Sequence, residues 1–293
     1  MKTLISYTIN DGIYVKFEDL SRELSQNLCR KYFFIEARSF RENKQTINLV
    51  TLVDFQGGEY LKFPPNQSFF KEVLKEYDCD VGEVIDLRAL PKIEGLTTTI
   101  TLRENQLEML EELEKFEYNG LITAKTGFGK TLLSIYIAQL LKTPMLFIAS
   151  RTSLIENLLK DCQTFNVDPN LITKVDTEWL SNPIITPIMY ATTSAINNET
   201  ILKELENKIG LKVADEIHMG ITSEIARNNI FRINSKYNIY LSATPENLKF
   251  ENLTEAVLSN NIITSEENID FTIELHTLCL KPSVSMRENF YST

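Results

Sequence analysis

A short apolar run passes into a glycine turn in Asn119-Gly120-Leu121-Ile122-Thr123-Ala124-Lys125-Thr126-Gly127-Phe128-Gly129-Lys130-Thr131. The apolar part predicts a buried strand, and the residues from Thr131 to Leu141 contain no breaker and predict a core-packed helix. Strand, glycine turn and helix in this order are typical of a phosphate-binding loop, because the backbone N–H groups of the turn and the helix N-terminus point at one centre. The stretch therefore predicts an α/β fold built around a P-loop.

The loop fits the pattern G-x-x-x-x-G-K-[ST] except at its first position, where Ala124 stands. Lys130 would reach the β- and γ-phosphates of a nucleotide, and Thr131 would hold Mg²⁺ through its hydroxyl. A chance glycine turn is the alternative, but such a pattern arises by accident in roughly a few per cent of chains of this length. The expected nucleotide-binding residues of the loop are Ala124, Lys125, Thr126, Gly127, Phe128, Gly129, Lys130 and Thr131.

Composition narrows the remaining possibilities. The 293 residues can hold two domains, and 43% apolar with 24% charged residues is ordinary for a globular protein. The longest apolar runs are far short of the roughly 18 residues of a transmembrane helix, so we expect a cytoplasmic protein without membrane contact. Four dispersed cysteines and two histidines favour neither a zinc site nor a disulfide framework. The net charge of −10 argues against a globally basic surface, but it leaves room for a local basic patch.

The first 95 residues predict a small α+β domain. Asn10-Asp11-Gly12 and Gln56-Gly57-Gly58-Glu59 are hairpin turns, because these residues tolerate positive φ. A helix that Asp19 or Ser21 can cap is expected to run to about Arg30, and a second helix is expected over 67–77. Strands are expected over 4–9, 13–17, 32–37, 46–55, 60–63 and 83–87. Residues 91–99, with one glycine and three threonines, predict a linker.

A modest basic patch lies within this domain. Its residues are Arg22, Arg30, Lys31, Arg38, Arg41 and Lys44, with aromatic residues interleaved. Phosphate clamping is one interpretation. The other interpretation is that the aromatic residues lie in a core and the basic residues are solvated. The sequence leaves both interpretations open.

The remaining chain predicts alternating helices and strands. Thr101 can cap a helix that runs through Lys115, and a helix is expected over 153–165. Strands are expected over 145–149, 171–175, 187–192 and 237–241, and a further strand from Leu211 ends in Asp215-Glu216-Ile217-His218. Since P-loop ATPases place an acidic residue at this position, Asp215 would hold Mg²⁺ and Glu216 would polarise the attacking water. Open parallel sheets bind ligands at the carboxyl edge, where Ser242-Ala243-Thr244 also lies.

Together these motifs resemble those of superfamily 2 helicases. The ordered set is Arg103/Gln106, AKTGFGKT, IASRTSLIENL, DEIH and LSATP. The resemblance implies a RecA-like lobe with a mostly parallel sheet that uses ATP and Mg²⁺. It implies that Arg103 and Gln106 contribute to the nucleotide site, with Gln106 reading the adenine edge. It further implies that Ser150, Arg151, Thr192 and Thr193 line a nucleic-acid path, and that His218, Ser242, Ala243 and Thr244 couple hydrolysis to movement.

Two departures from the superfamily pattern are Ala124, which many helicase relatives share, and Asn157, where glutamine is common. The small domain before the P-loop resembles the layout of phage UvsW-type branch-migration helicases. This narrower resemblance implies a monomeric motor that acts on branched or duplex DNA in preference to RNA. It also implies a location in the host cytoplasm, and a T5-like phage is one candidate source. It also suggests Arg38, Arg41 and Lys44 as DNA contacts.

We expect three segments: an accessory domain at 1–95, a first motor lobe at 96–260, and the start of a connection to a second lobe at 261–293. The arginine motif of a second lobe, Q-x-x-G-R-x-x-R, does not occur in these 293 residues. We therefore expect the front portion of a longer helicase with weak ATPase of its own. The alternatives are a nucleotide- and DNA-binding fragment with little ATPase, another type of superfamily 2 translocase subunit, and a P-loop kinase or metabolic ATPase.

Overall fold

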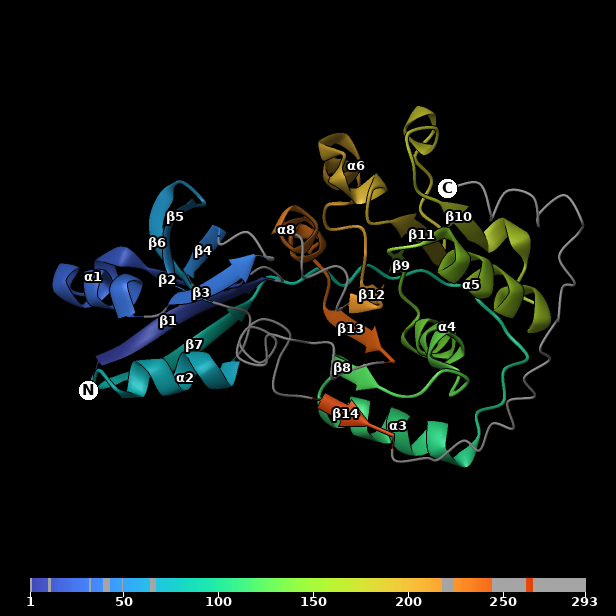
Figure 1. Ribbon diagram of the computed structural model, residues 1–293, viewed down its shortest axis with the longest axis horizontal. Helices are drawn as coiled ribbons and strands as arrows, with labels where there is room; N and C mark the ends of the chain where they lie inside the picture. The colour runs from blue at the N-terminus through green and yellow to red at the C-terminus, as the bar shows by residue number, and fades with distance from the viewer. Residues whose placement is uncertain are drawn as a thin grey trace, which may run out of the picture.

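The computed structural model describes residues 2–9, 12–31, 33–38, 43–48, 50–63, 67–217, 224–243 and 262–265. Two large sheets organise these residues, one at each end of the molecule, and a separate sheet of two strands lies beside the first (Figure 1). The α/β fold class is confirmed: a mostly antiparallel sheet precedes an all-parallel sheet of seven strands.

The small sheet has the strand order β5-β6-β2-β1-β7. Its strands are β1 (Lys2–Ile9), β2 (Gly12–Lys16), β5 (Thr51–Phe55), β6 (Gly58–Phe63) and β7 (Cys79–Asp86). The helices are α1 (Arg22–Lys31) and α2 (Gln67–Lys75), with a 3-10 turn, η1 (Phe17–Asp19), between β2 and α1. Leu28 of α1 and Leu74 of α2 join Ile13 and Leu61 of the sheet in one fully buried core. Both helices therefore cover one face.

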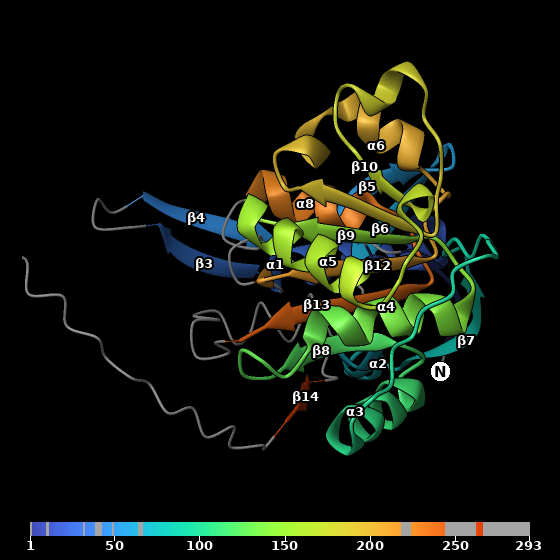
Figure 2. The same ribbon diagram turned by 90° about the vertical axis from the view of Figure 1, so that its right-hand side faces the viewer.

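The expected hairpin at Gln56-Gly57 is confirmed. Gln56 and Gly57 have φ of 52° and 76°, the consecutive positive values of a tight hairpin turn. The expected single strand over 46–55 is wrong, however. It is two strands, because β4 (Asn43–Asn48) pairs with β3 (Phe33–Arg38) whereas β5 pairs with β6. The β3–β4 hairpin projects beside the small sheet (Figure 2).

The large sheet has the order β10-β11-β9-β12-β13-β8-β14, and every described pair is parallel. The strands are β8 (Asn119–Thr123), β9 (Met145–Ala149), β10 (Ile172–Lys174), β11 (Ile188–Thr192), β12 (Leu211–Asp215), β13 (Tyr237–Ser242) and β14 (Ile262–Thr264). The helices are α3 (Glu104–Lys115), α4 (Lys130–Leu141), α5 (Thr152–Thr164), α6 (Glu199–Leu205) and α8 (Glu224–Arg232), and short 3-10 turns are η2 (Pro169–Leu171), η3 (Trp179–Ser181) and η4 (Ala195–Asn197). Figure 2 shows α4 and α5 in front of the strands.

The strands of this sheet are mostly apolar because both faces of the sheet are covered. In β9, Phe147 packs into the core under α3, α4 and α5, while Leu146 and Ile148 pack into the core under α6 and α8. The alternation of side chains along each strand thus supplies two separate cores.

Several features of this lobe differ from expectation, and one of them is helix α8, which was not anticipated. Thr101 does not cap α3: the N-cap is Arg103, and its N–H donates to Gln106 Oε1 at 3.0 Å. The short helix α6 was not anticipated, although Asn198 caps it by accepting from Thr200 N at 2.9 Å. β14 was not anticipated either. It lies in the segment 261–293 and pairs with β8. The domain boundaries themselves stay a prediction.

Residues 87–103 contain neither helix nor strand, yet they are attached to the large-sheet lobe along their length. The Thr143 hydroxyl donates to Pro91 O at 2.6 Å, Ile93 N donates to Lys142 O at 3.0 Å, and Thr99 N donates to Phe165 O at 3.1 Å. The segment runs from β7 past the ends of α4 and α5 to the start of α3 (Figure 1). The predicted linker is therefore a strap held against the lobe, and we use that name for residues 87–103.

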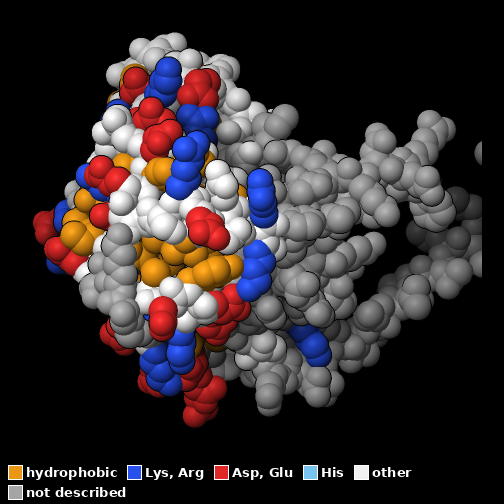
Figure 3. Space-filling model, turned by 90° about the vertical axis from the view of Figure 1, so that its left-hand side faces the viewer, with side chains coloured by type: hydrophobic (Ala, Val, Ile, Leu, Met, Phe, Trp, Pro, Cys, Tyr) orange, Lys and Arg blue, Asp and Glu red, His pale blue; other side chains and the backbone are white. Residues whose placement is uncertain are grey.

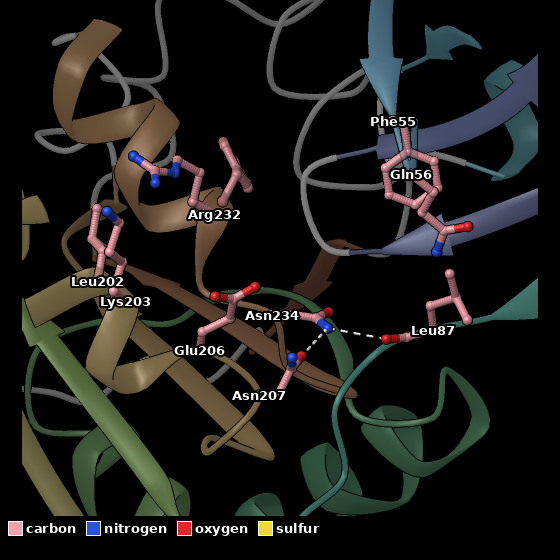
Figure 4. Close-up of a pocket in the computed structure, with 10 residues that line it drawn as sticks. Phe55, Gln56, Leu87, Leu202, Lys203, Glu206, Asn207, Arg232 and Asn234 are labelled. Carbon is pink, nitrogen blue, oxygen red and sulfur yellow. Dashed lines mark hydrogen bonds between the residues drawn. The ribbon is translucent and has the colours of Figure 1, made fainter. Parts of the chain in front are cut away.

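The two sheets meet at the loop that precedes β13. Asn234 Nδ2 donates to Leu87 O at 3.0 Å and to Asn207 Oδ1 at 2.8 Å, as Figure 4 shows. Beside these bonds is an open cleft of about 390 Å³. It lies between the β5–β6 turn, with Phe55 and Gln56, and helices α6 and α8 (Figure 4).

Candidate nucleotide site at the carboxyl edge of the parallel sheet

Strand register brings the predicted site residues to one edge. Asp215 lies opposite Ala149, Thr192 lies opposite Ala149 on the other side, and Ser242 lies opposite Thr123. The carboxyl ends of β8, β9, β11, β12 and β13 are therefore level with one another, although their sequence order is scattered across the chain. This is the edge at which open parallel sheets bind ligands.

The predicted P-loop connects β8 to α4. Gly129 has φ of 91° and is the N-cap of α4, a left-handed conformation in which glycine carries no steric cost. Lys130 Nζ donates to Ala124 O at 2.6 Å and to Lys125 O at 3.3 Å. The ammonium group thus lies folded over the loop at the helix N-terminus, where it can meet phosphate oxygens.

Arg103 and Gln106, at the start of α3, hold the far side of the loop. Gln106 Nε2 donates to Phe128 O at 2.7 Å, and Arg103 Nη2 donates to the same carbonyl oxygen. Arg103 Nη2 also donates to Gly127 O at 3.4 Å. The sequence analysis did not anticipate the bond to Phe128 O, and no motif around Gln106 indicates it.

Asp215 and Glu216 end β12 beside the loop. Burial and the adjacent charge of Glu216 raise the pKa of Asp215 to about 6, against the opposing effects of the Glu216 N–H and of Lys130. Burial lowers the pKa of Lys130, and the charges of Asp215 and Glu216 oppose this change. Glu216 has φ of 48°, an uncommon left-handed value for a residue with a side chain. The Lys130 ammonium group thus lies close to the Asp215 and Glu216 carboxyl groups at the carboxyl edge of the sheet, where little water reaches them.

These residues fit Mg²⁺ and a nucleoside triphosphate. Mg²⁺ commonly binds through one or two protein oxygens together with substrate phosphates and waters. The Thr131 hydroxyl and the Asp215 carboxylate are such a pair, and the described residues contain no cluster of three or more His, Cys, Asp or Glu that would hold a metal by itself. The Thr131 hydroxyl and the Asp215 carboxylate therefore suit a metal ion that is bound together with the phosphates of a nucleotide.

The predicted coupling residues lie partly at the same edge. Ser242 is fully buried at the end of β13, and its carbonyl oxygen accepts from Ala124 N at 3.3 Å, which ties this strand to the P-loop. Ala243 follows it. His218 and Thr244 lie outside the described residues.

The predicted nucleic-acid residues of this lobe follow β9 and β11. Ser150 and Arg151 lead into α5, and Arg151 is exposed. Thr192 Oγ1 lies 2.8 Å from Ser194 Oγ and accepts from Ala195 N, while Thr193 N donates to Ala149 O at 3.0 Å. The two turns are joined to each other, so the four residues form one continuous rim beside the P-loop edge.

The basic patch of the small domain is only partly described. Arg22, Arg30 and Lys31 are exposed on α1, and Lys31 Nζ pairs with Glu76 Oε2 at 2.5 Å. Arg38 and Lys44 are placed by their backbone on β3 and β4, their side chains being outside the described part, and Arg41 lies outside the described residues altogether. Figure 3 shows acidic and basic side chains interspersed on the described part of this end of the molecule. A contact with DNA through the patch stays a prediction.

Comparison with known proteins gives three findings. Residues 99–247 match the family described as "Type III restriction enzyme, res subunit". The putative helicase 161L of Invertebrate iridescent virus 6 is 28% identical over 151 residues, which cover 49% of this chain and 33% of that protein. The crystal structure of the UvsW helicase from Bacteriophage T4 is similar with a TM-score of 0.63 at 13% identity, covering 90% of this chain and 100% of that one.

These findings agree with the arrangement of the site. The chain spans about a third of the viral relative that it matches, and the similarity to UvsW is a similarity of fold, which includes the small sheet because the match covers most of the chain. Among the described residues there is no helix long and apolar enough to cross a membrane. The family match covers half of the chain and contains the P-loop, both acidic residues and the end of β13. The chain belongs to the family of the type III restriction enzyme res subunit, and its motifs and fold resemble those of superfamily 2 helicases such as UvsW.

Proposed function

We propose that this chain is the accessory domain and first motor lobe of an ATP-dependent DNA helicase or translocase that acts on branched DNA. The observation that carries the proposal is the convergence at one sheet edge of the Lys130 ammonium group and the Asp215 and Glu216 carboxyl groups. A structural role alone does not explain a cation held over a glycine loop beside two partly desolvated acids.

Each residue has a defined task in this proposal. The loop N–H groups and Lys130 bind the phosphates, and the Thr131 hydroxyl and the Asp215 carboxylate hold Mg²⁺. Bound Mg²⁺ neutralises charge on the β- and γ-phosphates. Glu216 orients the attacking water and accepts its proton. The bond between Ala124 N and Ser242 O offers a direct route by which a change in the loop reaches the Ser242-Ala243-Thr244 segment.

DNA is the proposed partner, in branched or duplex form ahead of RNA, and the chain acts as a monomer in the cytoplasm of a phage host. The continuous rim of Ser150, Arg151, Thr192 and Thr193 is the proposed contact on the motor lobe. The fold of UvsW, a helicase of Bacteriophage T4, supports the choice of a phage helicase. We propose branch migration as the activity because the small domain and the lobe together have the fold of UvsW.

A second candidate is a nucleotide- and DNA-binding unit that hydrolyses ATP slowly by itself. The observation that favours it is the lack of a Q-x-x-G-R-x-x-R sequence in these 293 residues. Without an arginine on the γ-phosphate, NTPases lose on the order of 10³-fold or more in rate. We therefore propose tight coupling of ATP turnover to a second lobe and only weak turnover by the chain alone.

The first test measures binding and hydrolysis separately. Mg·ATP affinity and single-turnover phosphate release on forked DNA are compared for the wild-type chain, Lys130→Ala, Glu216→Gln and a control, Lys160→Ala, on the exposed surface of α5. Lys130→Ala should lose at least about tenfold in affinity, since hydrogen bonds to charged groups contribute roughly 1.5–3 kcal/mol. Glu216→Gln should bind normally and release phosphate about 100-fold more slowly.

Two results would contradict the proposal. Unchanged ATP affinity in Lys130→Ala would show that residues 124–131 do not bind the phosphates. Loss of ATP binding in Glu216→Gln with normal behaviour of Lys160→Ala would show that Glu216, and not Asp215, holds the metal. Fusion of a second RecA-like lobe to the chain should raise phosphate release, and an unchanged rate would contradict the coupling.

A further inference from the structure

The open cleft between the small domain and helices α6 and α8 has an aromatic wall. Phe55, the last residue of β5, lines the cleft, and the centre of its ring lies 4.4 Å from that of Tyr14 and 5.2 Å from that of Tyr60. Tyr14 and Tyr60 are each only 4% exposed. The Phe55 ring is therefore supported from behind by two buried rings, and it borders the cleft (Figure 4).

The opposite wall comes from the C-terminal parts of α6 and α8. Leu202 and Phe231 are its apolar residues, and each is 6% exposed. The volume of about 390 Å³ lies within the range of roughly 300–1,000 Å³ of small-molecule sites. The cleft is thus large enough for a planar group that packs against Phe55.

The charges at this cleft balance one another. Arg232 pairs with Glu199 through both of its terminal nitrogen atoms, at 2.8 and 2.7 Å, and Lys203 and Glu206 contribute one charge of each sign. A phosphate group would therefore gain little here, because phosphate binding depends on an excess of basic side chains. The cleft suits an uncharged planar group better.

Carboxamide groups supply the polar part of the lining. Gln56, Asn207 and Asn234 reach the cleft from the β5–β6 turn, the turn after α6 and the loop before β13 (Figure 4). Gln56 is exposed, and within the described part of the chain its side chain has no hydrogen-bond partner. Each amide carries donors and an acceptor. An aromatic wall with such groups beside it matches a nucleobase, whose face stacks and whose edge carries donors and acceptors.

The cleft is also within reach of DNA that lies on the rim. Thr193 of the rim is followed by η4, and Asn198 caps α6 directly after it. α6 runs from Glu199 to Leu205, which is roughly 10 Å at about 1.5 Å per residue, and Leu202 near its end lines the cleft. A strand held at the rim therefore needs about three nucleotides, at roughly 3.4 Å each, to reach the cleft.

We infer that this cleft binds one unpaired base of the DNA strand that the rim holds. The base stacks on Phe55, its edge meets the carboxamide groups, and its phosphate stays outside the cleft. The inference rests on the proposed DNA-binding function and adds to it a base-binding site to which the small domain contributes one wall. A free nucleotide carries the same base, and it is tested beside the strand.

The test removes single bases from the DNA. The full chain is titrated with a forked duplex whose short single-stranded arm carries an abasic site at each position in turn, and fluorescence anisotropy gives the affinities. For the wild-type chain, an abasic site at one position, or at two adjacent positions, should lower the affinity about tenfold, the effect of one lost stacking contact. Abasic sites elsewhere in the arm should change it by less than about twofold. The decrease should be the same at low and high salt, because no phosphate contact is lost.

Two variants assign the effect to the cleft. Phe55→Leu keeps apolar packing against Tyr14 but removes the planar ring, so it should lower the affinity for the intact fork about fivefold and abolish the effect of the abasic sites. Gln56→Gly suits the left-handed backbone at φ of 52° and leaves the aromatic rings untouched. It should lower the affinity about fivefold, the effect of one hydrogen bond. Leu140→Ala, at an exposed position of α4, is the control and should change nothing.

Three outcomes would contradict the inference. Equal affinities of the wild-type chain for all abasic forks, or an unchanged abasic effect in Phe55→Leu that circular dichroism shows to be folded, would overturn it and leave DNA binding at the rim intact. Saturable binding of free deoxyadenosine monophosphate in calorimetry, if Phe55→Leu abolishes it, would assign the cleft to a free nucleotide and overturn it as well. A wild-type chain that binds none of the forks at low salt would contradict the proposed DNA-binding function itself, and this site with it.

Discussion

Lys212 lies on β12, three residues before Asp215, and its side chain is fully buried. Its Nζ donates to Ile230 O at 2.8 Å and to Ile233 O at 3.3 Å, and it lies 5.7 Å from the centre of the Phe231 ring. The ammonium group thus binds carbonyl groups at the C-terminal end of α8, where the helix dipole favours a cation. One charged side chain thus fixes α8 to the strand that ends in Asp215.

Replacement of this lysine should destabilise the lobe. Lys212→Met keeps the apolar stem but leaves the two carbonyl oxygens without this donor, and we expect a loss of about 1–3 kcal/mol in the free energy of unfolding. Urea denaturation measures it. Lys208→Met is the matched control, because Lys208 forms only an exposed pair with Glu204 at 3.1 Å, and it should cost less than about 0.5 kcal/mol. An unchanged or higher midpoint for Lys212→Met would mean that desolvation of the ammonium group outweighs its bonds.

At the scale of elements, β7 is joined to the large-sheet lobe by an ion cluster at the start of the strap. Asp86 pairs with Arg88 at 2.8 Å and with Lys236 at 2.6 Å, and Lys236 N donates to Ala89 O at 2.7 Å. Burial acts to raise the pKa of Asp86, but hydrogen bonds from Arg88 and Lys236 outweigh it and hold that pKa well below its ordinary value of 3.8. The charged form is therefore favoured by folding.

This cluster gives a prediction with a defined pH dependence. Since the folded-state pKa of Asp86 is depressed, its stabilisation is complete above the unfolded-state pKa near 4 and is lost as the pH falls through the lower folded-state value. Asp86→Asn should cost about 1–2 kcal/mol at pH 7, and the difference from wild type should shrink below about pH 4. Chemical denaturation at pH 7 and pH 3 measures it. The exposed Asp168→Asn, at the cap of a 3-10 turn, is the comparison, and a difference that grows at pH 3 would contradict the account.

The sequence predicts individual helices, strands and motifs better than it predicts the contacts between segments that are far apart in the chain. β8, the P-loop and α4 follow from a pattern within 25 residues of chain, roughly, and that pattern reports directly on burial and on positive φ. The bond between Gln106 and Phe128 O joins residues 22 positions apart, and nothing in either residue type indicates it. The division of 46–55 into β4 and β5 was missed because both halves have strand composition and only their partners differ. Seven-residue α6 is too short for a helical period to be distinguished.

The strap illustrates the same difficulty. Its glycine and threonines are typical of a flexible linker, and the prediction from composition was correct about the lack of helix and strand. Its fixed path depends on acceptors and donors at the ends of α4 and α5, such as Lys142 O and Phe165 O. These partners become adjacent only after the large sheet has assembled.

At the scale of the whole molecule, the predicted DNA contacts lie in both parts of the chain: the basic patch belongs to the small domain, and the rim of Ser150, Arg151, Thr192 and Thr193 belongs to the large-sheet lobe. If Arg38, Arg41 and Lys44 bind phosphates, replacing all three by glutamate should weaken binding of forked duplex DNA. It should also reduce the slope of log affinity against log salt by about 3, since each phosphate contact contributes about 0.9 to that slope. The expected loss applies equally to different DNA sequences, because phosphate contacts carry no base readout.

The control reverses the same number of charges elsewhere. Lys160, Lys203 and Lys208 lie on α5, on α6 and in the turn after α6, and their replacement by glutamate changes the net charge equally. Fluorescence anisotropy across a salt series compares the two triple variants with wild type. If both triple variants give the same slope of log affinity against log salt, the basic patch does not contact DNA and its residues are only solvated.

The strand order of the large sheet also has a consequence for synthesis on the ribosome. Among the described strands, β8 pairs with β13 and β14 alone, and the bond between Asn238 and Asn119 spans 119 positions. At about 5–20 residues per second, roughly ten seconds pass between the translation of the two partners. The small sheet is complete once β7 has emerged, because all five of its strands precede residue 87. We therefore expect the nascent chain to form its small sheet first, while β8 stays without its described sheet neighbours until β13 leaves the exit tunnel.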